Sequence, residues 1–267
     1  MAQGNPTSSK PAIVVIPGGA CPVVFYNDLV SSLTKDGYEA ETHNLRSYTD
    51  DPKNSEPQGL AEDAAYFHEK IEALADQGKD VVVVGHSYGG LVTTDAAHGL
   101  SKAERESAGK RGGVVRIIYL SCIVGAVGST SAETCADRLP TFDFMEPFDE
   151  TGKFLKQNAE KSAHIVFSDM PLEEGKQWVS KMWCHSSRSF SDKIQHAAYL
   201  ENPVTWIFCT KDEVLLPSFQ RGCIEFIEQE KKGEKVDVVE LEVGHCPNVS
   251  AIELTAKTIV EAVERNA

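Results

Sequence analysis

The sequence of 267 residues predicts an α/β fold: a doubly wound, mainly parallel six-stranded sheet with helices on both faces and an inserted helical cap. Three observations lead to this prediction. Six short apolar runs alternate with helix-like stretches, as they do where crossover helices join parallel strands. Four consecutive valines lead into a glycine-rich turn before residue 90, which is typical of a buried parallel strand. The alternation stops after residue 124 and resumes at residue 200, which indicates an insertion between two strands of the sheet.

These breaks predict the division of the chain. We expect a flexible N-terminal tail over residues 1–10 and a core built from residues 11–124 and 200–267. The residues between the two parts of the core, 125–199, are called the cap segment below. A chain of this length can still form one α/β domain.

The first part of the core contains two predicted strands and two predicted helices. The apolar run of residues 12–16 predicts a buried strand that enters a glycine turn. Residues 25–37 have apolar positions at intervals of four and end in a glycine, as a helix does. Residues 38–45 predict a second strand, and the polar residues 46–59 predict a loop. Residues 60–78 carry one apolar face and end in a glycine, which predicts another helix.

The middle of the chain holds two more predicted strands before the rhythm breaks. The valines 81–84 predict a buried strand, and residues 91–98 can form the helix that follows. Residues 101–113 are charged and rich in glycine, so they predict a helix end and a loop. Residues 114–121 predict the next apolar strand.

Aromatic and methionine side chains crowd into the cap segment, where Pro171 can begin a helix. After it the alternation returns. We predict strands over residues 204–209 and 236–243, a helix that begins at Pro217, and a last helix over residues 248–264.

Composition limits the class of protein. Hydrophobic residues make up 41% of the chain, enough for a large core. The 26 basic and 40 acidic residues give a net charge of −14, which argues against nucleic acid and membrane surfaces as partners. We therefore expect a small-molecule substrate as the partner and a monomer or homodimer as the assembly.

The sequence also bears on compartment and on metals. No apolar run approaches the roughly 20 residues that a membrane span needs, and the first ten residues lack the apolar region of a secretory signal. The seven cysteines are scattered and form no C-x-x-C pair. We therefore expect a cytoplasmic protein with free thiols and without a zinc site.

The strongest motif is Gly85-His86-Ser87-Tyr88-Gly89-Gly90, which lies between a predicted strand and a predicted helix. In this context Gly-x-Ser-x-Gly is typical of a nucleophile elbow, where glycines allow the backbone to come close around a strained serine. The helix that follows directs its positive end at the serine oxygen. The alternative is a plain glycine-rich turn between a strand and a helix. We predict Ser87 as a nucleophile.

Partners for Ser87 are expected at the carboxyl ends of the other strands, where functional groups gather in a parallel sheet. His245 follows the last predicted strand and is placed to act as a base; the alternative is a surface loop histidine. Asp212 follows the preceding strand and can orient the imidazole. Glu213 is the alternative if the strand ends one residue later, and a solvated loop carboxylate paired with Lys211 is the other interpretation.

An oxyanion hole would complete an acyl-transfer site. The backbone N–H groups of Tyr88 and Gly19 are the predicted donors, because Tyr88 follows the nucleophile and Gly19 follows the first strand. An ordinary strand-to-helix turn at Gly19 is the competing interpretation. His86 points away from the nucleophile in this arrangement, so we interpret it as structural.

The substrate pocket is expected between the elbow and the cap segment. The candidate lining residues flank the site elements or belong to the aromatic cluster; they are Gly18, Cys21, Phe142, Phe144, Trp183 and Cys246. The histidines other than His86 and His245 follow no metal spacing, and we interpret most of them as surface or helix-face residues.

Taken together, these motifs resemble the α/β-hydrolase superfamily over residues 11–267, and the order Ser87, Asp212, His245 is the order of that fold. The chain is most similar to the compact group that holds plant methylesterases, hydroxynitrile lyases and related fungal and bacterial hydrolases. The resemblance implies a carboxylic ester hydrolase with a cap over the site and no cofactor. Hydroxynitrile lyases have a threonine at the position of Gly18 and a lysine at the position of Cys246, so these two positions favour an esterase.

The sequence therefore predicts a serine hydrolase that cleaves a carboxylic ester or thioester of an apolar or aromatic small molecule through an acyl-enzyme. One alternative keeps Ser87, Asp212 and His245 but not hydrolysis, giving lactonisation, another cyclisation or cleavage of a C–C bond. A second alternative is a ligand-binding receptor on the same fold.

Overall fold

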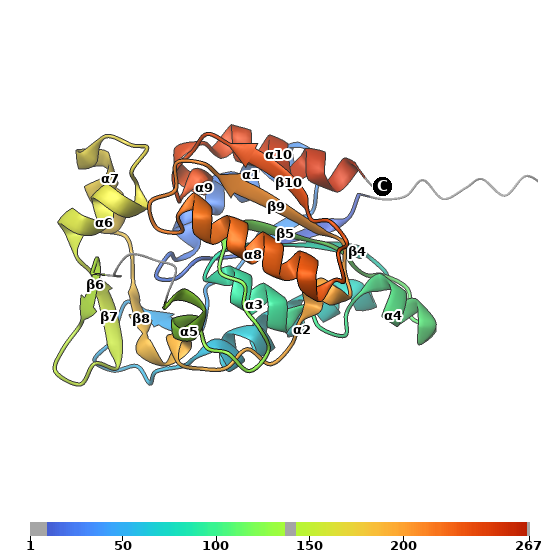
Figure 1. Ribbon diagram of the computed structural model, residues 1–267, viewed down its shortest axis with the longest axis horizontal. Helices are drawn as coiled ribbons and strands as arrows, with labels where there is room; N and C mark the ends of the chain where they lie inside the picture. Colours follow the sequence, from blue (N-terminus) through green and yellow to red (C-terminus); the bar gives the residue numbers. More distant parts are fainter. Residues whose placement is uncertain (1–9, 137–142, 266–267) are drawn as a thin grey trace, which may run out of the picture.

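The computed structural model describes residues 10–136 and 143–265, and in this part of the chain the predicted α/β fold is confirmed (Figure 1). A six-stranded sheet has the order β10-β9-β5-β4-β1-β2, and all of its neighbouring strands are parallel. Its strands in chain order are β1 Ala12–Ile16, β2 Ala40–Thr42, β4 Asp80–Ser87, β5 Gly113–Cys122, β9 Val204–Cys209 and β10 Asp237–Leu241. All six correspond to the strands predicted from the apolar runs.

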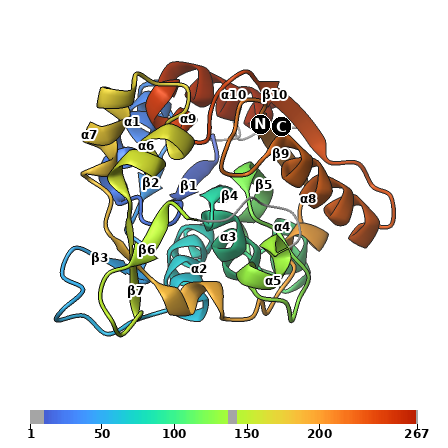
Figure 2. The ribbon, with the colours of Figure 1, turned by 60° about the vertical axis from the view of Figure 1, so that its left-hand side comes forward.

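Helices cover both faces of this sheet. On one face α1 (Asn27–Lys35) packs against α10 (Ile252–Glu264), and on the other α2 (Leu60–Asp76) packs against α3 (Gly89–Ala96) (Figures 1 and 2). The remaining helices of the core are α4 Lys102–Ser107, α8 Pro217–Glu230 and α9 Pro247–Ser250, with a 3-10 turn at Val23–Phe25. Because every central strand is buried on both sides, the strands consist almost entirely of apolar residues.

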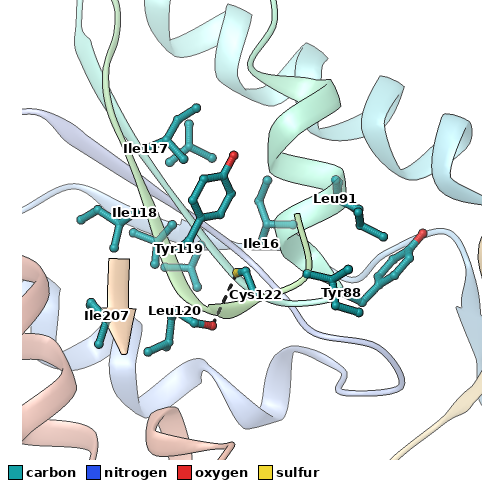
Figure 3. Packing of buried hydrophobic residues seen from close by; sticks show 14 of the residues in the cluster. Ile16, Tyr88, Leu91, Ile117, Ile118, Tyr119, Leu120, Cys122 and Ile207 are labelled. Carbon is teal, nitrogen blue, oxygen red and sulfur yellow. Dashed lines mark hydrogen bonds between the residues drawn. The ribbon is translucent and has the colours of Figure 1, made fainter. Parts of the chain in front are cut away.

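The core lies between the central strands and these helices. Figure 3 shows Ile16 of β1 and Tyr119 of β5 in one cluster with Leu91 of α3 and Tyr88 of the elbow. Tyr119 is fully buried, and its hydroxyl group hydrogen-bonds to Thr94 of α3 at 2.8 Å. The turn that carries Ser87 is therefore anchored in the main hydrophobic core.

Two predicted segments differ in detail from the structure. The last helix is interrupted at Ala251, whose φ of −142° and ψ of 50° separate α9 from α10. The loop predicted over residues 46–59 contains a two-residue strand, β3 (Tyr48–Thr49). A strand this short has no hydrophobic period of its own, because its pairing depends on a partner far along the chain.

The cap segment contains helices, as predicted, and also three short strands. Its elements are α5 Ser131–Cys135, β6 Met145–Pro147, β7 Phe154–Gln157, α6 Ala159–Val166, α7 Leu172–Val179 and β8 Cys184–Ser186, with 3-10 turns at Ser187–Phe190 and Ala198–Leu200. Pro171 precedes α7, where the sequence predicted a helix start. β6, β7 and β8 form an antiparallel sheet in the order β3-β8-β7-β6, so a strand from the core completes it.

The predicted N-terminal tail lies outside the described residues except for Lys10. None of the helices in residues 10–136 and 143–265 combines the length and apolarity that crossing a bilayer requires.

Candidate active site

Ser87 is the last residue of β4 and has a φ of +55°, in the left-handed region that side chains other than glycine rarely adopt. The glycines around it have no room for a side chain. A Cβ on Gly85 would lie 2.8 Å from the Gly89 carbonyl oxygen, and a Cβ on Gly89 would lie 2.5 Å from the Pro17 carbonyl oxygen. The backbone thus has the strained strand-to-helix turn that the motif predicts.

Ser87, His245 and Asp212 come together in one hydrogen-bonded chain. The Ser87 Oγ lies 3.0 Å from His245 Nε2, and His245 Nδ1 lies 2.7 Å from Asp212 Oδ2. A carboxylate can only accept hydrogen bonds, so His245 carries its proton on Nδ1 and presents the Nε2 lone pair to the serine hydroxyl. Asp212 and His245 are both buried. The geometry matches that of a nucleophile, a base and an orienting acid.

Asp212, and not Glu213, faces the histidine, and further donors hold it. Its Oδ1 accepts the backbone N–H groups of Val214 and Leu215 at 2.8 Å each. The Ser121 hydroxyl donates to its Oδ2. Ser121 was not predicted, although it lies at the end of strand β5 and the strand-end argument that selected Asp212 applies to it equally.

His86 connects the elbow to two other parts of the site, which supports its structural interpretation. Its Nε2 lies 2.8 Å from the carbonyl oxygen of His245, so Nε2 carries the proton. Its Nδ1 accepts the hydroxyl group of Tyr26 at 2.7 Å, and that hydroxyl oxygen accepts the Gly18 N–H at 2.7 Å. Burial lowers the pKa of His86 to about 3, so its ring is neutral at ordinary pH. We call Gly18, Tyr26, His86 and the His245 carbonyl the Tyr26–His86 chain.

The predicted oxyanion donors lie beside Ser87. Gly19 and Tyr88 lie close together, since a Cβ on Gly19 would lie 3.6 Å from the Tyr88 Cβ. Among the described residues, neither backbone N–H donates a hydrogen bond to another group. Ala20, the next residue, has a φ of +60°, so the turn after β1 is strained. Two free donors next to a serine are suited to bind a negatively charged oxygen.

A cavity opens over Ser87 between the core and the cap segment. Three predicted candidates line it: Gly18, Cys21 and Phe144. Its other lining residues are mostly apolar or belong to the site already described; they are Gly19, His86, Ser87, Tyr88, Ile123, Met145, Gln157, Val166, Met182, His185, Phe190, Val214, Leu215 and His245. The lining therefore favours an apolar ligand.

The other three candidates have different positions. The Trp183 ring packs edge-on against Tyr48 at 5.9 Å and is not among the lining residues, whereas its neighbour Met182 is. Cys246 is buried and its thiol interacts with that of Cys21, but unlike Cys21 it is not among the lining residues. The Cys21 thiol and burial raise the pKa of the Cys246 thiol. Phe142 lies outside the described residues.

His185 of β8 is a lining residue that the sequence analysis missed. The expectation that such histidines lie at the surface is wrong for this one, because its side chain is fully buried. Its ring packs edge-on against Tyr88, with 4.9 Å between the ring centroids. No signal in the sequence marks it, since β8 becomes a strand only by pairing with β3 and β7.

Asp169, between α6 and α7, links the cap segment to the loop that carries His245. Its Oδ2 accepts the Gly244 N–H and the Ser250 hydroxyl, each at 2.7 Å. In addition, the described residues contain no group of three or more His, Cys, Asp or Glu side chains that could bind a metal ion.

The fold and this arrangement define a class of protein, and sequence comparison agrees. The chain belongs to the alpha/beta hydrolase family, whose sequence profile matches residues 13–258. The predicted superfamily, and with it an α/β-hydrolase-type enzyme, is thereby confirmed.

Individual proteins are also similar to this chain, in sequence or in fold. A probable hydrolase, R7, of Phoma sp. is 33% identical over 254 residues, which cover 95% of this chain and 98% of the relative. A pyrethroid hydrolase from Sphingobium faniae shares the fold with a TM-score of 0.69 at 21% identity, covering 96% of this chain and 98% of that one. The Arabidopsis methylesterase MES16 has a TM-score of 0.67 at 17% identity, with 94% and 98% covered. At these identities the two structures show the fold alone.

Proposed function

We propose that this protein is a serine hydrolase that cleaves a carboxylic ester or thioester of an apolar or aromatic small molecule. One observation carries the proposal: Ser87 and His245, which line the cavity, are joined by a hydrogen bond of 3.0 Å, and Asp212 is joined to His245 by one of 2.7 Å. Each of the three has the donor or acceptor state that its role requires.

The first half of the reaction transfers the acyl group to the enzyme. The Ser87 Oγ attacks the carbonyl carbon while its proton moves to His245 Nε2. Asp212 stabilises the imidazolium that forms, and the Gly19 and Tyr88 N–H groups bind the oxyanion. When the tetrahedral intermediate collapses, the bond to the leaving group breaks and His245 gives the leaving oxygen or sulfur its proton.

The second half releases the acid. A water molecule gives a proton to His245 Nε2 and attacks the acyl carbon, and the bond to Ser87 Oγ then breaks as His245 returns the proton to that oxygen. Tyr26 and His86 position the groups used in both halves, since the Tyr26–His86 chain joins the oxyanion turn to the histidine loop.

The substrate class follows from the cavity. Its walls include Ile123, Phe144, Val166 and Phe190, which favour an apolar or aromatic group beside the reacting carbonyl. The names of a pyrethroid hydrolase and a methylesterase among proteins of the same fold are consistent with ester substrates.

The first prediction is that a fluorophosphonate probe labels Ser87 and that Ser87→Ala abolishes the labelling. The same substitution should lower kcat for p-nitrophenyl acetate by at least ~10³-fold, because the nucleophile is lost while binding remains. Peptide mass spectrometry and steady-state kinetics measure the two effects.

The matched control is Ser107→Ala, on the surface helix α4, which should label and turn over like the unchanged protein. Full turnover by Ser87→Ala would refute the mechanism. Hydrolysis in ¹⁸O-water distinguishes the alternative chemistries, since a cyclisation or lyase reaction places no ¹⁸O in the product.

A further inference from the structure

His185 Nδ1 is a buried polar atom without a hydrogen-bond partner among the described residues. The side chain has no exposed surface, and leaving a buried acceptor unpaired costs free energy. The atom lies at the edge of the site: a Cβ on Gly19 would be 2.8 Å from it. The unpaired nitrogen therefore adjoins the turn whose N–H we assign to the oxyanion hole.

The neighbours of the other ring nitrogen determine which nitrogen carries the proton. His185 Nε2 lies 2.9 Å from the Ser189 Oγ and 3.0 Å from the Ser47 Oγ. The Ser189 hydroxyl donates to the Ser186 carbonyl at 2.8 Å, and the Ser47 hydroxyl interacts with the Asp63 carboxylate. We assign the two hydroxyl protons to these acceptors, because a backbone carbonyl can only accept and a carboxylate is a stronger acceptor than a neutral imidazole nitrogen.

With this assignment His185 donates from Nε2, which leaves Nδ1 as a lone-pair acceptor. The His185 ring is neutral at ordinary pH, because burial lowers the pKa of His185 to about 3. Asp63, which is buried on α2, also fixes two neighbours of the His185 ring. It accepts the Tyr88 hydroxyl at 3.0 Å and the Ser47 N–H at 2.9 Å. These contacts hold the His185 ring in one orientation.

A lone pair beside an oxyanion hole would repel a bare oxyanion, so the site is best completed by a hydrogen-bond donor at that place. We propose that His185 Nδ1 accepts a hydrogen bond from a hydroxyl group that the substrate carries on the carbon next to the reacting carbonyl. His185 is then a specificity-determining residue for 2-hydroxy acyl esters. This inference rests on the proposed function, because it assigns the substrate class of the same site.

The test compares methyl mandelate with methyl phenylacetate, two esters that differ only in that hydroxyl group. The ratio of kcat/KM for methyl mandelate to kcat/KM for methyl phenylacetate is divided by the ratio of the rates at which hydroxide hydrolyses the two esters without enzyme. This corrected ratio no longer contains the effect of the hydroxyl group on the reactivity of the ester itself. The unchanged protein should prefer methyl mandelate by ~10-fold or more, since a site with a buried acceptor discriminates against a substrate that leaves it unpaired. A corrected ratio near 1 overturns the proposal without any variant.

Variants then test whether the preference for methyl mandelate depends on His185. His185→Phe should lower the corrected ratio to about 1, and His185→Asn, which keeps an acceptor close to the position of Nδ1, should retain part of it. His164→Phe is the matched control, because His164 is an exposed histidine of α6 that does not line the cavity, and the ratio should not change. Retention of the full preference in His185→Phe, or an equal loss in His164→Phe, would overturn the assignment.

Fluorophosphonate labelling separates this inference from the proposed function. If Ser87 is labelled and the corrected ratio is near 1, the proposed serine hydrolase is supported and the proposed role of His185 is wrong. If Ser87 is not labelled and neither ester is cleaved, both fall.

Discussion

Two buried histidines have opposite surroundings at this site. Both nitrogens of His86 have partners, and each partner's chemistry determines where the proton lies. His185 has partners for one nitrogen only among the residues that the structure describes. The paired ring of His86 stabilises the fold around Ser87, whereas the half-paired ring of His185 is the one for which we propose a ligand.

At the same scale, Tyr26→Phe should lower kcat/KM by about 10-fold while the protein still folds. The substitution leaves the Gly18 N–H without its acceptor and His86 Nδ1 without its donor, which should cost about 2–4 kcal/mol of stability. Steady-state kinetics and chemical denaturation measure the two effects. We expect most of the kinetic loss in kcat, since the Tyr26–His86 chain contacts the turn at Gly18 and the loop of His245 and leaves the apolar walls of the cavity unchanged.

Tyr38→Phe is the control for this prediction. Tyr38 is also buried, and its hydroxyl group donates to Glu264 at 3.2 Å on the far side of the core. Its removal should affect stability alone. Equal kinetic losses in the two variants would show that the Tyr26–His86 chain has no specific role.

At the scale of elements, the elbow depends on how closely α3 approaches the end of β1. A Cβ on Gly89 would lie 2.5 and 2.6 Å from the Pro17 and Ile16 carbonyl oxygens, and backbone atoms cannot move aside cheaply. The glycine is therefore required by packing between two elements and not by a positive φ of its own.

We expect Gly89→Ala to destabilise the protein by about 3 kcal/mol, because inserting an atom into a close-packed contact forces a backbone shift. Gly175→Ala on α7 is the matched change: its Cβ would come no closer than 3.2 Å to a neighbour, and alanine is the better helix former. The second variant should stay within about 1 kcal/mol of the unchanged protein. Thermal and chemical unfolding would contradict this account if both variants lost the same stability.

The sequence predicted those elements that have a pattern of their own. The six strands of the main sheet and the helices beside them have a clear period, and the ends of three of these strands indicated Ser87, Asp212 and His245, which the fold brings together. β3 and β8 could not be predicted, because strands of two and three residues are defined by their partners. His185 was missed for that reason.

At the scale of the whole molecule, burial of His86 and His185 makes stability depend on pH. The pKa of each falls from 6.5 to about 3 on folding. Above pH 6.5 both are neutral whether folded or not. As the pH falls below 6.5, both histidines become protonated in the unfolded chain but stay neutral in the folded protein. Each histidine therefore lowers the free energy of unfolding by about 1.4 kcal/mol for each pH unit of this fall.

The unchanged protein should thus lose about 2 kcal/mol more stability than His86→Gln between about pH 7 and about pH 5, because the glutamine does not titrate. Denaturation at both pH values measures this difference. The buried carboxyl groups of Asp63 and Asp95, whose pKa burial raises to about 6, act in the opposite direction but contribute to both proteins alike. Equal losses in the two proteins would show that His86 is protonated in the folded state.

The pairing of β3 with β8 bears on how this architecture can be divided and recombined. Tyr48 and Thr49 belong to the core in sequence, yet they form the outer strand of the small sheet that covers the site. Removing residues 125–199 would take away β8, the strand that pairs with β3. A cap taken from another hydrolase would have to pair with a β3 whose register matches β8. Chimeras of this fold should therefore exchange residues 46–59 together with the cap, as one unit made of two separate pieces of chain.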